Sequence, residues 1–174
     1  MGKLFGTDGV RGIANKELTP ELAFRLGRAA GTLLKNKDKR TSIVLGKDTR
    51  VSGSMLEGAL VAGICSAGVD VKLAGVIPTP AIAYLTRKEK AVAGVVISAS
   101  HNAYYDNGIK FFNEQGYKLA DELEEKIEEL VLGDMENLPR PIGDNLGKSI
   151  PFNDARECYI NFLKKQIDAN FKGL

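Results

Sequence analysis

Four short segments of the chain combine small residues with groups that can bind a negatively charged ligand. They are residues 6–12 (GTDGVRG), 47–53 (KDTRVSG), 98–102 (SASHN) and 106–110 (DNGIK). Three of the four contain glycine, which lets backbone N–H groups approach an anion closely, and the same three contain Lys or Arg. These segments therefore favour a site for an anionic ligand.

Ser100, in the third segment, can carry a phosphoryl group. Such a group adds roughly −1.5 to −2 charges and three acceptor oxygens, so cations must surround it. The segments offer four cations, namely Arg11, Lys47, Arg50 and Lys110. Each also has an ordinary structural interpretation, since Arg50, for example, follows Asp48 and could be half of a local ion pair. The combination of the four with a serine is what favours phosphate chemistry.

A serine hydrolase is the alternative chemistry for Ser100. Its nucleophile would require a general base, and the only histidine of the chain is the next residue, His101. Adjacent side chains point to opposite sides of an extended segment, so we expect His101 to be badly placed to accept the Ser100 proton. The G-x-S-x-G motif is also absent. Both observations argue against hydrolysis.

Alternating strand and helix patterns must position these segments. Short apolar runs predict strands at 41–46, 69–76 and 91–98, and the third run is apolar on both faces, as in a buried parallel strand. Helical spacing predicts helices over 20–35, 80–87, 120–132 and 153–169. A further helix is predicted to run through residue 64, with Ser54 and Glu57 as a capping box at its start.

This order of elements predicts an α/β fold with a doubly wound, mostly parallel sheet and helices on both faces. Asn107-Gly108 predicts a tight turn, so we expect a hairpin added to the sheet. Ligands of such sheets bind beyond the carboxyl ends of the strands. Arg50 and Ser100 each follow a predicted strand, and we therefore expect them at this edge.

The C-terminal third of the chain carries no comparable motif. The acidic run 121–129 is interspersed with Leu and Ile, which predicts the solvated face of a helix packed on the sheet. Residues 133–152 are rich in Pro, Gly and Asn and predict a linker. The last predicted helix places Tyr159, Phe162, Leu163 and Ile167 on one stripe, which would be exposed without a partner and leaves a homodimer open. We divide the chain into a first domain, 1–135, and a linker and helix, 136–174, that lead into a truncated second domain.

The composition excludes several classes of protein. The chain has 174 residues, 44% hydrophobic and 26% charged, which is typical of a globular protein. A net charge of +2 gives no argument for a nucleic-acid surface. The apolar runs are too short for a membrane span, the N-terminus has no signal-peptide core, and the two cysteines lack metal or disulfide spacing. We expect a cytoplasmic protein with free thiols.

The four segments also resemble a known family. Gly-Thr-Asp-Gly-Val-Arg-Gly, Gly-Lys-Asp-Thr-Arg, Ile-Ser-Ala-Ser-His-Asn and Asp-Asn-Gly-Ile-Lys are similar to the first of the four domains of the α-D-phosphohexomutases. The resemblance implies that a phosphoserine at Ser100 gives its phosphoryl group to a hexose phosphate. The bisphosphate intermediate then reorients and returns its other phosphate to the serine. The first motif, so close to the N-terminus, favours a hexosamine phosphate as substrate, with interconversion of glucosamine 6-phosphate and glucosamine 1-phosphate for amino-sugar and cell-wall synthesis.

The resemblance also implies roles for single residues. Catalytic roles fall to Ser100 as phosphoryl carrier, to His101 beside it, and to Lys110 as acid/base or charge stabiliser. Binding of substrate or phosphate falls to Arg11, Asn102, Arg50 and Lys47. Through its phosphate, Ser100 would also be a ligand of Mg²⁺, which prefers oxygen donors. A metal and fixed cations suit phosphoryl transfer, which depends on positioning and neutralisation of charge.

Two departures from the family pattern matter. Ala103 stands where Pro usually follows His-Asn, and this change removes no reactive group. The family's metal loop and its second, third and fourth domains are missing from these residues, so we expect the remaining Mg²⁺ ligands in the second domain and no mutase activity from this chain alone. A phosphomannomutase or phosphoglucomutase domain and a non-catalytic sugar-phosphate-binding module remain the alternatives.

Overall fold

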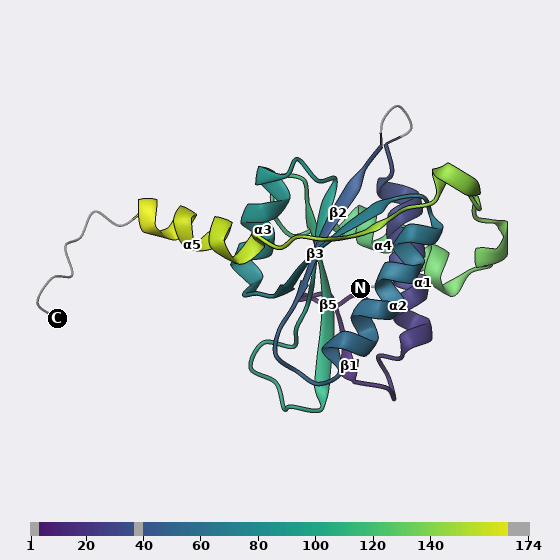
Figure 1. Ribbon diagram of the computed structural model, residues 1–174. Helices are drawn as coiled ribbons and strands as arrows, with labels where there is room; N and C mark the ends of the chain where they lie inside the picture. The colour runs from purple at the N-terminus through teal and green to yellow at the C-terminus, as the bar shows by residue number, and fades with distance from the viewer. Residues whose placement is uncertain (1–3, 37–39, 167–174) are drawn as a thin grey trace, which may run out of the picture.

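A mixed six-stranded sheet, in the order β1-β5-β4-β2-β3-β6, forms the centre of the protein (Figure 1). Its strands are β1 (Val10–Ile13), β2 (Ser42–Lys47), β3 (Asp70–Val76), β4 (Ala93–Ile97), β5 (Asp106–Asn113) and β6 (Ser149–Pro151). The helices are α1 (Pro20–Leu34), α2 (Gly53–Ser66), α3 (Thr79–Lys88), α4 (Asp121–Leu132) and α5 (Ala155–Lys165). The computed structural model describes residues 4–36 and 40–166.

Strand directions agree with the predicted α/β fold. β2 pairs in parallel with both β3 and β4, and β6 pairs in parallel with β3. β5 runs antiparallel to β4 on one side and to β1 on the other, so it supplies the predicted hairpin. The prediction of a mostly parallel sheet with an added hairpin is confirmed.

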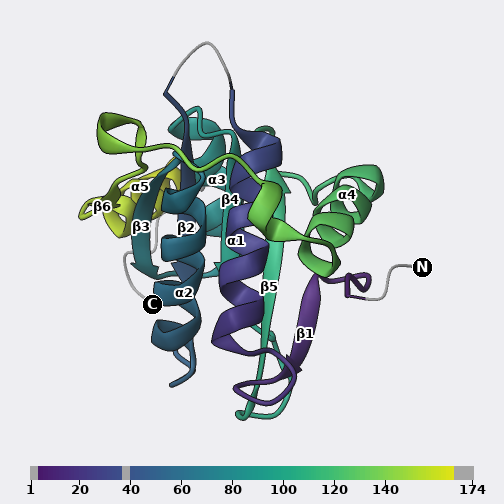
Figure 2. The ribbon, with the colours of Figure 1, turned by 90° about the vertical axis from the view of Figure 1, so that its right-hand side faces the viewer.

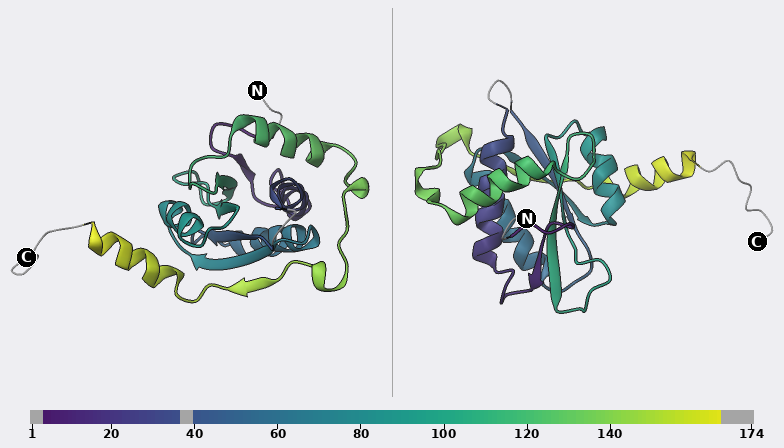
Figure 3. Two further views of the ribbon diagram at one scale, coloured as in Figure 1. Left: turned by 90° about the horizontal axis from the view of Figure 1, so that it is seen from above. Right: turned by 180° about the vertical axis from the view of Figure 1, so that it is seen from behind.

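Helices cover both faces of the sheet, as predicted (Figure 3). α1, α2 and α4 lie on one face and enclose the larger apolar core, which includes Leu26, Leu60 and Ile127. α3 lies on the other face over a smaller core that contains Ile82 and Val96, and α5 follows it there. Among the described residues, no helix combines the length and apolarity that a bilayer span requires.

Glycines let α1 and α2 pack closely on this face. A Cβ on Gly63 would collide with the Phe24 carbonyl oxygen, and one on Gly27 would lie 2.5 Å from the Leu60 carbonyl oxygen. Neither position can accept alanine without separating the helices. α1 itself begins as predicted, because the Thr19 hydroxyl accepts from the Leu22 N–H at 3.2 Å and Pro20 takes the first turn.

The predicted turn at Asn107-Gly108 is wrong. Both residues lie inside β5 and pair with β1, a strand that the sequence pattern did not reveal. The turn that joins β4 to β5 is instead the loop after Ile97. Asn107 is fully buried and uses its side-chain oxygen to accept from the Gly108 N–H at 2.8 Å. A turn-forming dipeptide is therefore held in a strand by its tertiary contacts.

The predicted capping box at the start of α2 is also wrong. The helix begins at Gly53, and its N-cap residue Ser52 makes no side-chain capping bond. Ser54 in the first turn and Glu57 just after it both accept from the Lys47 ammonium, at 3.1 and 2.7 Å. A cation from β2 thus replaces the backbone N–H groups as their partner.

The acidic helix α4 is only partly the solvated face that its sequence predicts. Glu122, Glu125 and Glu129 are exposed, but Glu124 and Glu128 are 5% and 8% exposed. Each buried carboxylate has a specific partner, since Glu124 accepts from the Lys118 ammonium and Glu128 from backbone N–H groups. Burial of a carboxylate requires such partners.

The region predicted as a linker adds a strand to the sheet. β6 pairs with β3, and Asp70 at the start of β3 accepts from Arg40 at 2.7 Å and from the Lys148 N–H at 2.8 Å. A side-chain carboxylate therefore anchors the approach to β6. Residues 133–152 were predicted as a linker because they are rich in turn-forming residues. The contact with Asp70 comes from a distant part of the chain and has no local sequence signal.

α5 extends from this edge past α3 (Figure 1). The Phe162 ring stacks on Tyr84 of α3 with centroids 4.1 Å apart, and the Tyr159 ring lies 6.1 Å from that of Tyr84. Part of the predicted apolar stripe is thus covered within the chain. Leu163 is 41% exposed, and Ile167, together with the predicted end of the helix, lies outside the described residues.

Candidate functional site

The loops after β2 and β4 meet at the carboxyl edge of the sheet, as expected from the order of elements (Figure 1). They enclose an open hollow of about 530 Å³. Its lining includes Asp48 and Arg50 from one loop and Ser98, Ser100 and Asn102 from the other. Two of the four sequence segments are therefore directly in contact around one hollow.

Ser100 lies exposed at the tip of its loop in an uncommon backbone conformation. Its φ is 55°, in the left-handed region that residues with a Cβ rarely adopt. The Ser100 N–H donates to the hydroxyl of buried Ser98 at 3.0 Å, and the Asn102 N–H donates to the Ala99 carbonyl at 3.1 Å. These bonds fix the backbone of the loop on either side of the exposed serine side chain. Left-handed residues held by their surroundings are frequent at functional sites.

The Arg50 guanidinium holds this loop in place. Its Nε donates to Asp48 at 3.0 Å, and its two terminal nitrogens donate to three backbone carbonyls of the serine loop and to one at the start of β5. Those carbonyls belong to Ser100, Asn102, Ala103 and Asp106. All five N–H donors of the guanidinium are used. Arg50 therefore supports the loop and offers an anion its charge but no free donor.

Arg11 joins the N-terminal segment to the serine loop. It donates to the Asn102 side-chain oxygen at 3.3 Å and to Asp8 at 2.8 Å, and its buried Nε has no partner. Asn102 in turn donates to Asp106 at 3.1 Å. A third sequence segment and the start of the fourth thus reach the site through side chains.

Ser52 and Asn107 add a connection that the sequence did not indicate. The buried Asn107 amide donates to the Ser52 hydroxyl at 2.9 Å and so ties β5 to the residue before α2. The Ser98 N–H donates to the Gly108 carbonyl at 2.8 Å on the same strand. Neither contact has a sequence signal, because each joins residues that are far apart or unremarkable in type.

Neither Lys47 nor Lys110 forms a hydrogen bond with Ser100. Lys47 is held by Ser54 and forms an ion pair with Glu57 at 2.7 Å. Lys110 lies within β5, opposite Val96, and no hydrogen bond or ion pair joins its side chain to any described residue. Their roles in phosphate binding and acid/base chemistry stay predictions.

His101 lies closer to Ser100 than the sequence argument expected. The Ser100 hydroxyl oxygen and His101 Nδ1 are 3.4 Å apart. Because Ser100 is left-handed rather than extended, the two side chains do not point to opposite sides, and the argument from alternation was wrong. The absence of a G-x-S-x-G elbow is unaffected by this contact.

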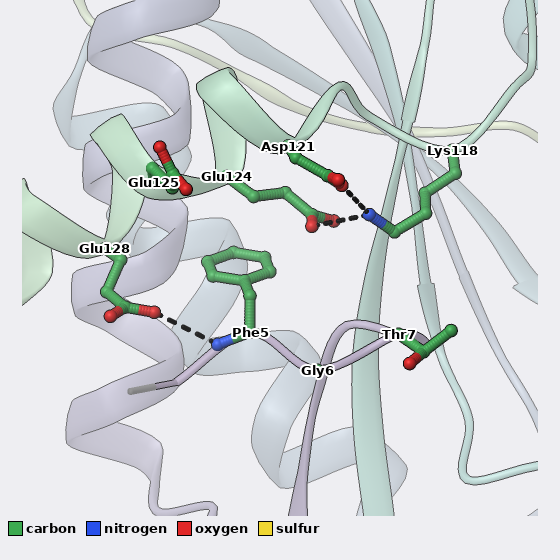
Figure 4. A pocket seen from close by; sticks show the side chains of 8 residues that line it. All are labelled: Phe5, Gly6, Thr7, Lys118, Asp121, Glu124, Glu125 and Glu128. Carbon is green, nitrogen blue, oxygen red and sulfur yellow. Dashed lines mark hydrogen bonds and ion pairs between the residues drawn. The ribbon is translucent and has the colours of Figure 1, made fainter. Parts of the chain in front are cut away.

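A second hollow, of about 480 Å³, flanks the N-terminal segment (Figure 4). Glu128 accepts from the N–H groups of Leu4 and Phe5, at 2.8 and 3.1 Å, and fixes the chain that leads to residues 6–12. Lys118 donates to both Asp121 and Glu124 at 2.7 Å. Burial raises the pKa of Glu124, and the Lys118 ammonium opposes that rise. The residues around this hollow therefore help to hold the N-terminal segment 6–12 in place.

Mg²⁺ fits this chain only as one partner of a larger site. The described residues contain no group of three or more His, Cys, Asp or Glu side chains that could hold a metal ion. A phosphorylated Ser100 would add oxygen donors of the kind that Mg²⁺ prefers. The expectation that the remaining Mg²⁺ ligands lie in a second domain stays a prediction.

Comparison with known proteins agrees with this arrangement. The model of the phosphoglucomutase/phosphomannomutase alpha/beta/alpha domain I matches residues 2–137. A phosphoglucosamine mutase of Desulforamulus reducens is 62% identical over 174 residues, which are 100% of this chain and 39% of that protein. A phosphoglucosamine mutase of Carboxydothermus hydrogenoformans is 60% identical, again over 100% of this chain and 39% of that protein.

Solved structures give the same result. A putative phosphomannomutase from Thermus thermophilus matches with a TM-score of 0.77 and 31% identity, over 97% of this chain and 37% of that one. A family protein from Burkholderia thailandensis matches with a TM-score of 0.76 and 25% identity, over 94% and 36%. The chain thus spans about two fifths of the length of its relatives. With its fold, its serine loop and these matches, the chain belongs to the phosphoglucomutase/phosphomannomutase family and carries the first α/β/α domain of that family.

Proposed function

We propose that this chain is the phosphoserine-bearing domain of an enzyme that interconverts glucosamine 6-phosphate and glucosamine 1-phosphate. The observation that carries the proposal is the exposed, left-handed Ser100 on a loop whose carbonyls are held by Arg50. The sugar is inferred from relatives named phosphoglucosamine mutase at 55–62% identity. A cytoplasmic enzyme of amino-sugar synthesis would be consistent with these relatives.

The proposed reaction uses Ser100 as a temporary carrier. The bond between the serine oxygen and phosphorus breaks as a bond forms from phosphorus to a hydroxyl oxygen of the hexosamine phosphate, and the proton of that hydroxyl passes to the released serine oxygen. The resulting bisphosphate then reorients within the site and returns its other phosphoryl group to the serine. His101 Nδ1 lies 3.4 Å from the serine oxygen, which supports a role for His101 in holding a proton there.

The cations of the site would act on the charge of the phosphoryl group. Arg11 contacts the serine loop through the Asn102 side chain, and Arg50 contacts the same loop through the Asn102 carbonyl. Phosphoryl transfer depends mainly on such positioning and charge neutralisation. Mg²⁺, when bound to the phosphate of Ser100, would supply further charge neutralisation.

Further domains of the enzyme would complete the site. Relatives are longer than this chain, which covers 39% of their length. We place the first domain at 1–135 and assign 136–174 to the connection toward a second. Because the serine then lacks its metal ligands and the substrate most of its contacts, we expect no turnover of glucosamine 6-phosphate by residues 1–174 alone. Measurable turnover by the pure chain would contradict this expectation.

Intact-mass spectrometry before and after phosphatase treatment tests the carrier role. The full-length enzyme is first incubated with glucosamine 1,6-bisphosphate, the intermediate of the proposed reaction, which can donate a phosphoryl group to the serine. We expect one phosphate that phosphatase removes, present in wild type and absent from Ser100→Ala. Ser149→Ala is the matched control, because Ser149 is also exposed but lies in β6. A phosphate that persists in Ser100→Ala would overturn the assignment.

Substrate preference needs a separate measurement on the full-length enzyme. Rates with the phosphates of glucosamine, mannose and glucose distinguish the proposed activity from a phosphomannomutase or a phosphoglucomutase. We expect glucosamine 6-phosphate to give the highest kcat/KM. A higher value for mannose or glucose phosphate would keep the carrier role of Ser100 but reject the sugar.

A further inference from the structure

A hollow of about 490 Å³ lies on the outer side of α1, lined by that helix, α2 and the segment after α4. Figure 2 shows that segment running across the outer side of α1 and α2. None of the residues that line this hollow lines the hollow around Ser100. The volume is within the usual range, about 300–1,000 Å³, for sites that bind small molecules. Its location separates it from the phosphoserine chemistry.

The inner wall of the hollow contains an arginine that the chain leaves almost without partners. Arg28, in the middle of α1, is 2% exposed. Its Nη2 donates to the Leu138 carbonyl at 3.1 Å, while its Nε is buried and has no hydrogen-bond partner. No carboxylate of the described residues forms an ion pair with it. A buried guanidinium with most of its donors unused is costly unless something else binds it.

A second cation increases that cost. Arg140 lines the same hollow. Burial is the main cause that lowers the pKa of Arg28, and the positive charge of Arg140 lowers it further. Glu21 and Glu136 also line the hollow, yet neither forms an ion pair with an arginine in the described part of the chain. Two cations without bound carboxylates therefore face one cavity.

Arg25 shows that this lack of partners is specific. It also lines the hollow, but it donates to the carbonyls of Val131 and Gly133 at the end of α4. Those carbonyls are unpaired at a helix C-terminus, so Arg25 has a structural role. No comparable structural role accounts for the unused donors of Arg28.

Part of the wall is apolar. Phe24, Ala59 and Met135 contribute ring, methyl and thioether surface. A ligand that matches both parts would carry a negative group for the arginines and an apolar body for these side chains. Inorganic phosphate would satisfy only the first requirement.

We propose that this hollow is a binding site for a small amphipathic anion, with the negative group on Arg28 and Arg140 and the apolar part against Phe24 and Met135. The ligand class is a phosphate monoester or carboxylate that carries an aromatic or aliphatic group. The site is independent of Ser100 and would remain if the proposed mutase activity were wrong.

Titration of the chain with phenyl phosphate, followed by calorimetry and by NMR of the arginine Nε–H groups, tests the proposal. We expect saturable binding, a shift of the Arg28 Nε–H resonance, and weaker binding of inorganic phosphate. Arg28→Met and Arg140→Met should each lower the affinity for phenyl phosphate about tenfold, which is the usual effect of losing one charge-assisted hydrogen bond. Arg140 is exposed, so this variant keeps the test valid if Arg28→Met does not fold.

Controls separate this site from others. Arg156→Met removes an exposed arginine of α5 and should leave binding unchanged. Ser100→Ala should also leave it unchanged, because Ser100 lies at the other hollow. Absence of saturable binding, or equal affinity in wild type and both Arg28→Met and Arg140→Met, would overturn the proposal.

Discussion

Arg50 and Arg28 are both largely buried arginines on the same domain, but the chain treats them differently. The Arg50 side chain is 11% exposed, pairs with Asp48 and uses every N–H donor. Arg28 is 2% exposed, has one carbonyl partner and leaves its Nε unpaired. The first is therefore part of the structure of the serine loop, while the second has unused binding capacity.

This difference shows how a buried cation can be assigned a role. Sequence alone treated Arg50 as a phosphate ligand, because it lies in a loop after a strand. Its complete set of partners supports the serine loop, and its role in phosphate binding stays a prediction. Arg28 had no sequence signal, since a single Arg on an amphipathic helix is ordinary, and only its missing partners distinguish it.

Arg50→Met should have the largest effect on stability. It leaves Asp48 and four carbonyls without their common donor, and loss of hydrogen bonds to a charged group in a partly buried site costs about 2–3 kcal/mol. Urea unfolding at neutral pH measures the free energy of unfolding. Arg50→Lys is the matched control and should recover only part of the loss, because an ammonium cannot reproduce the planar fork. A loss below about 1 kcal/mol in Arg50→Met would contradict the supporting role.

Asp70→Asn should have the next largest effect on stability. It tests a third arginine, Arg40, which pairs with Asp70. Asp70 accepts two bonds from Arg40 and one from the Lys148 N–H. Loss of the charged acceptor should cost about 2 kcal/mol at neutral pH. The hydrogen bond with Arg40 chiefly lowers the pKa of Asp70 from its usual 3.8, although burial opposes this.

The sign of the pH dependence follows from that lowered pKa. The folded carboxyl has the lower pKa, so it contributes stability above pH 3.8 that is lost as the pH falls through the folded value. Urea unfolding between pH 7 and pH 3 should show a smaller acid-induced loss in Asp70→Asn than in wild type. Parallel curves for the two proteins would show that Asp70 does not contribute this linkage.

Arg28→Met should change stability in the opposite direction to Arg50→Met. Methionine fills similar space without a charge, and replacement of a poorly paired buried cation is often neutral or stabilising. We expect a gain of about 1 kcal/mol in the free energy of unfolding in the absence of any anion. A loss as large as that of Arg50→Met would show that Arg28 is also a structural arginine.

Asn102→Ala should have the smallest effect on stability. The side chain links Arg11 to Asp106 in a partly exposed position, so its loss should cost about 1 kcal/mol or less. Chemical shifts of the residues around Ser100 should change more than the unfolding midpoint does. A midpoint shift comparable with that of Arg50→Met would mean that the two residues hold the loop equally.

The sequence predicted the central elements of the fold. Thr19-Pro20 marked the start of α1, and the apolar runs marked β2, β3 and β4, because these signals are local. Asn107-Gly108 was misassigned, since its strand conformation comes from pairing with β1 and from the contact with Ser52. β6 was missed for the same reason, as its approach is held by Asp70 from a distant strand.

The candidate site was predictable as a set of segments but not as a geometry. Ser100 and Arg50 were expected at one edge, and they line one hollow. The left-handed conformation of Ser100, the support from Ser98 and the pairing of Lys47 with Glu57 depend on tertiary contacts that residue types alone do not encode. Loop position was therefore easier to predict than the direction of each side chain.

The most direct measurement of the central claim is the steady-state rate of the full-length enzyme with glucosamine 6-phosphate, in wild type and in Ser100→Ala. If the serine oxygen carries the phosphoryl group, its removal should lower kcat by about four orders of magnitude or more, while circular dichroism and unfolding show an intact fold. A Ser100→Ala enzyme that keeps the wild-type kcat would contradict the account.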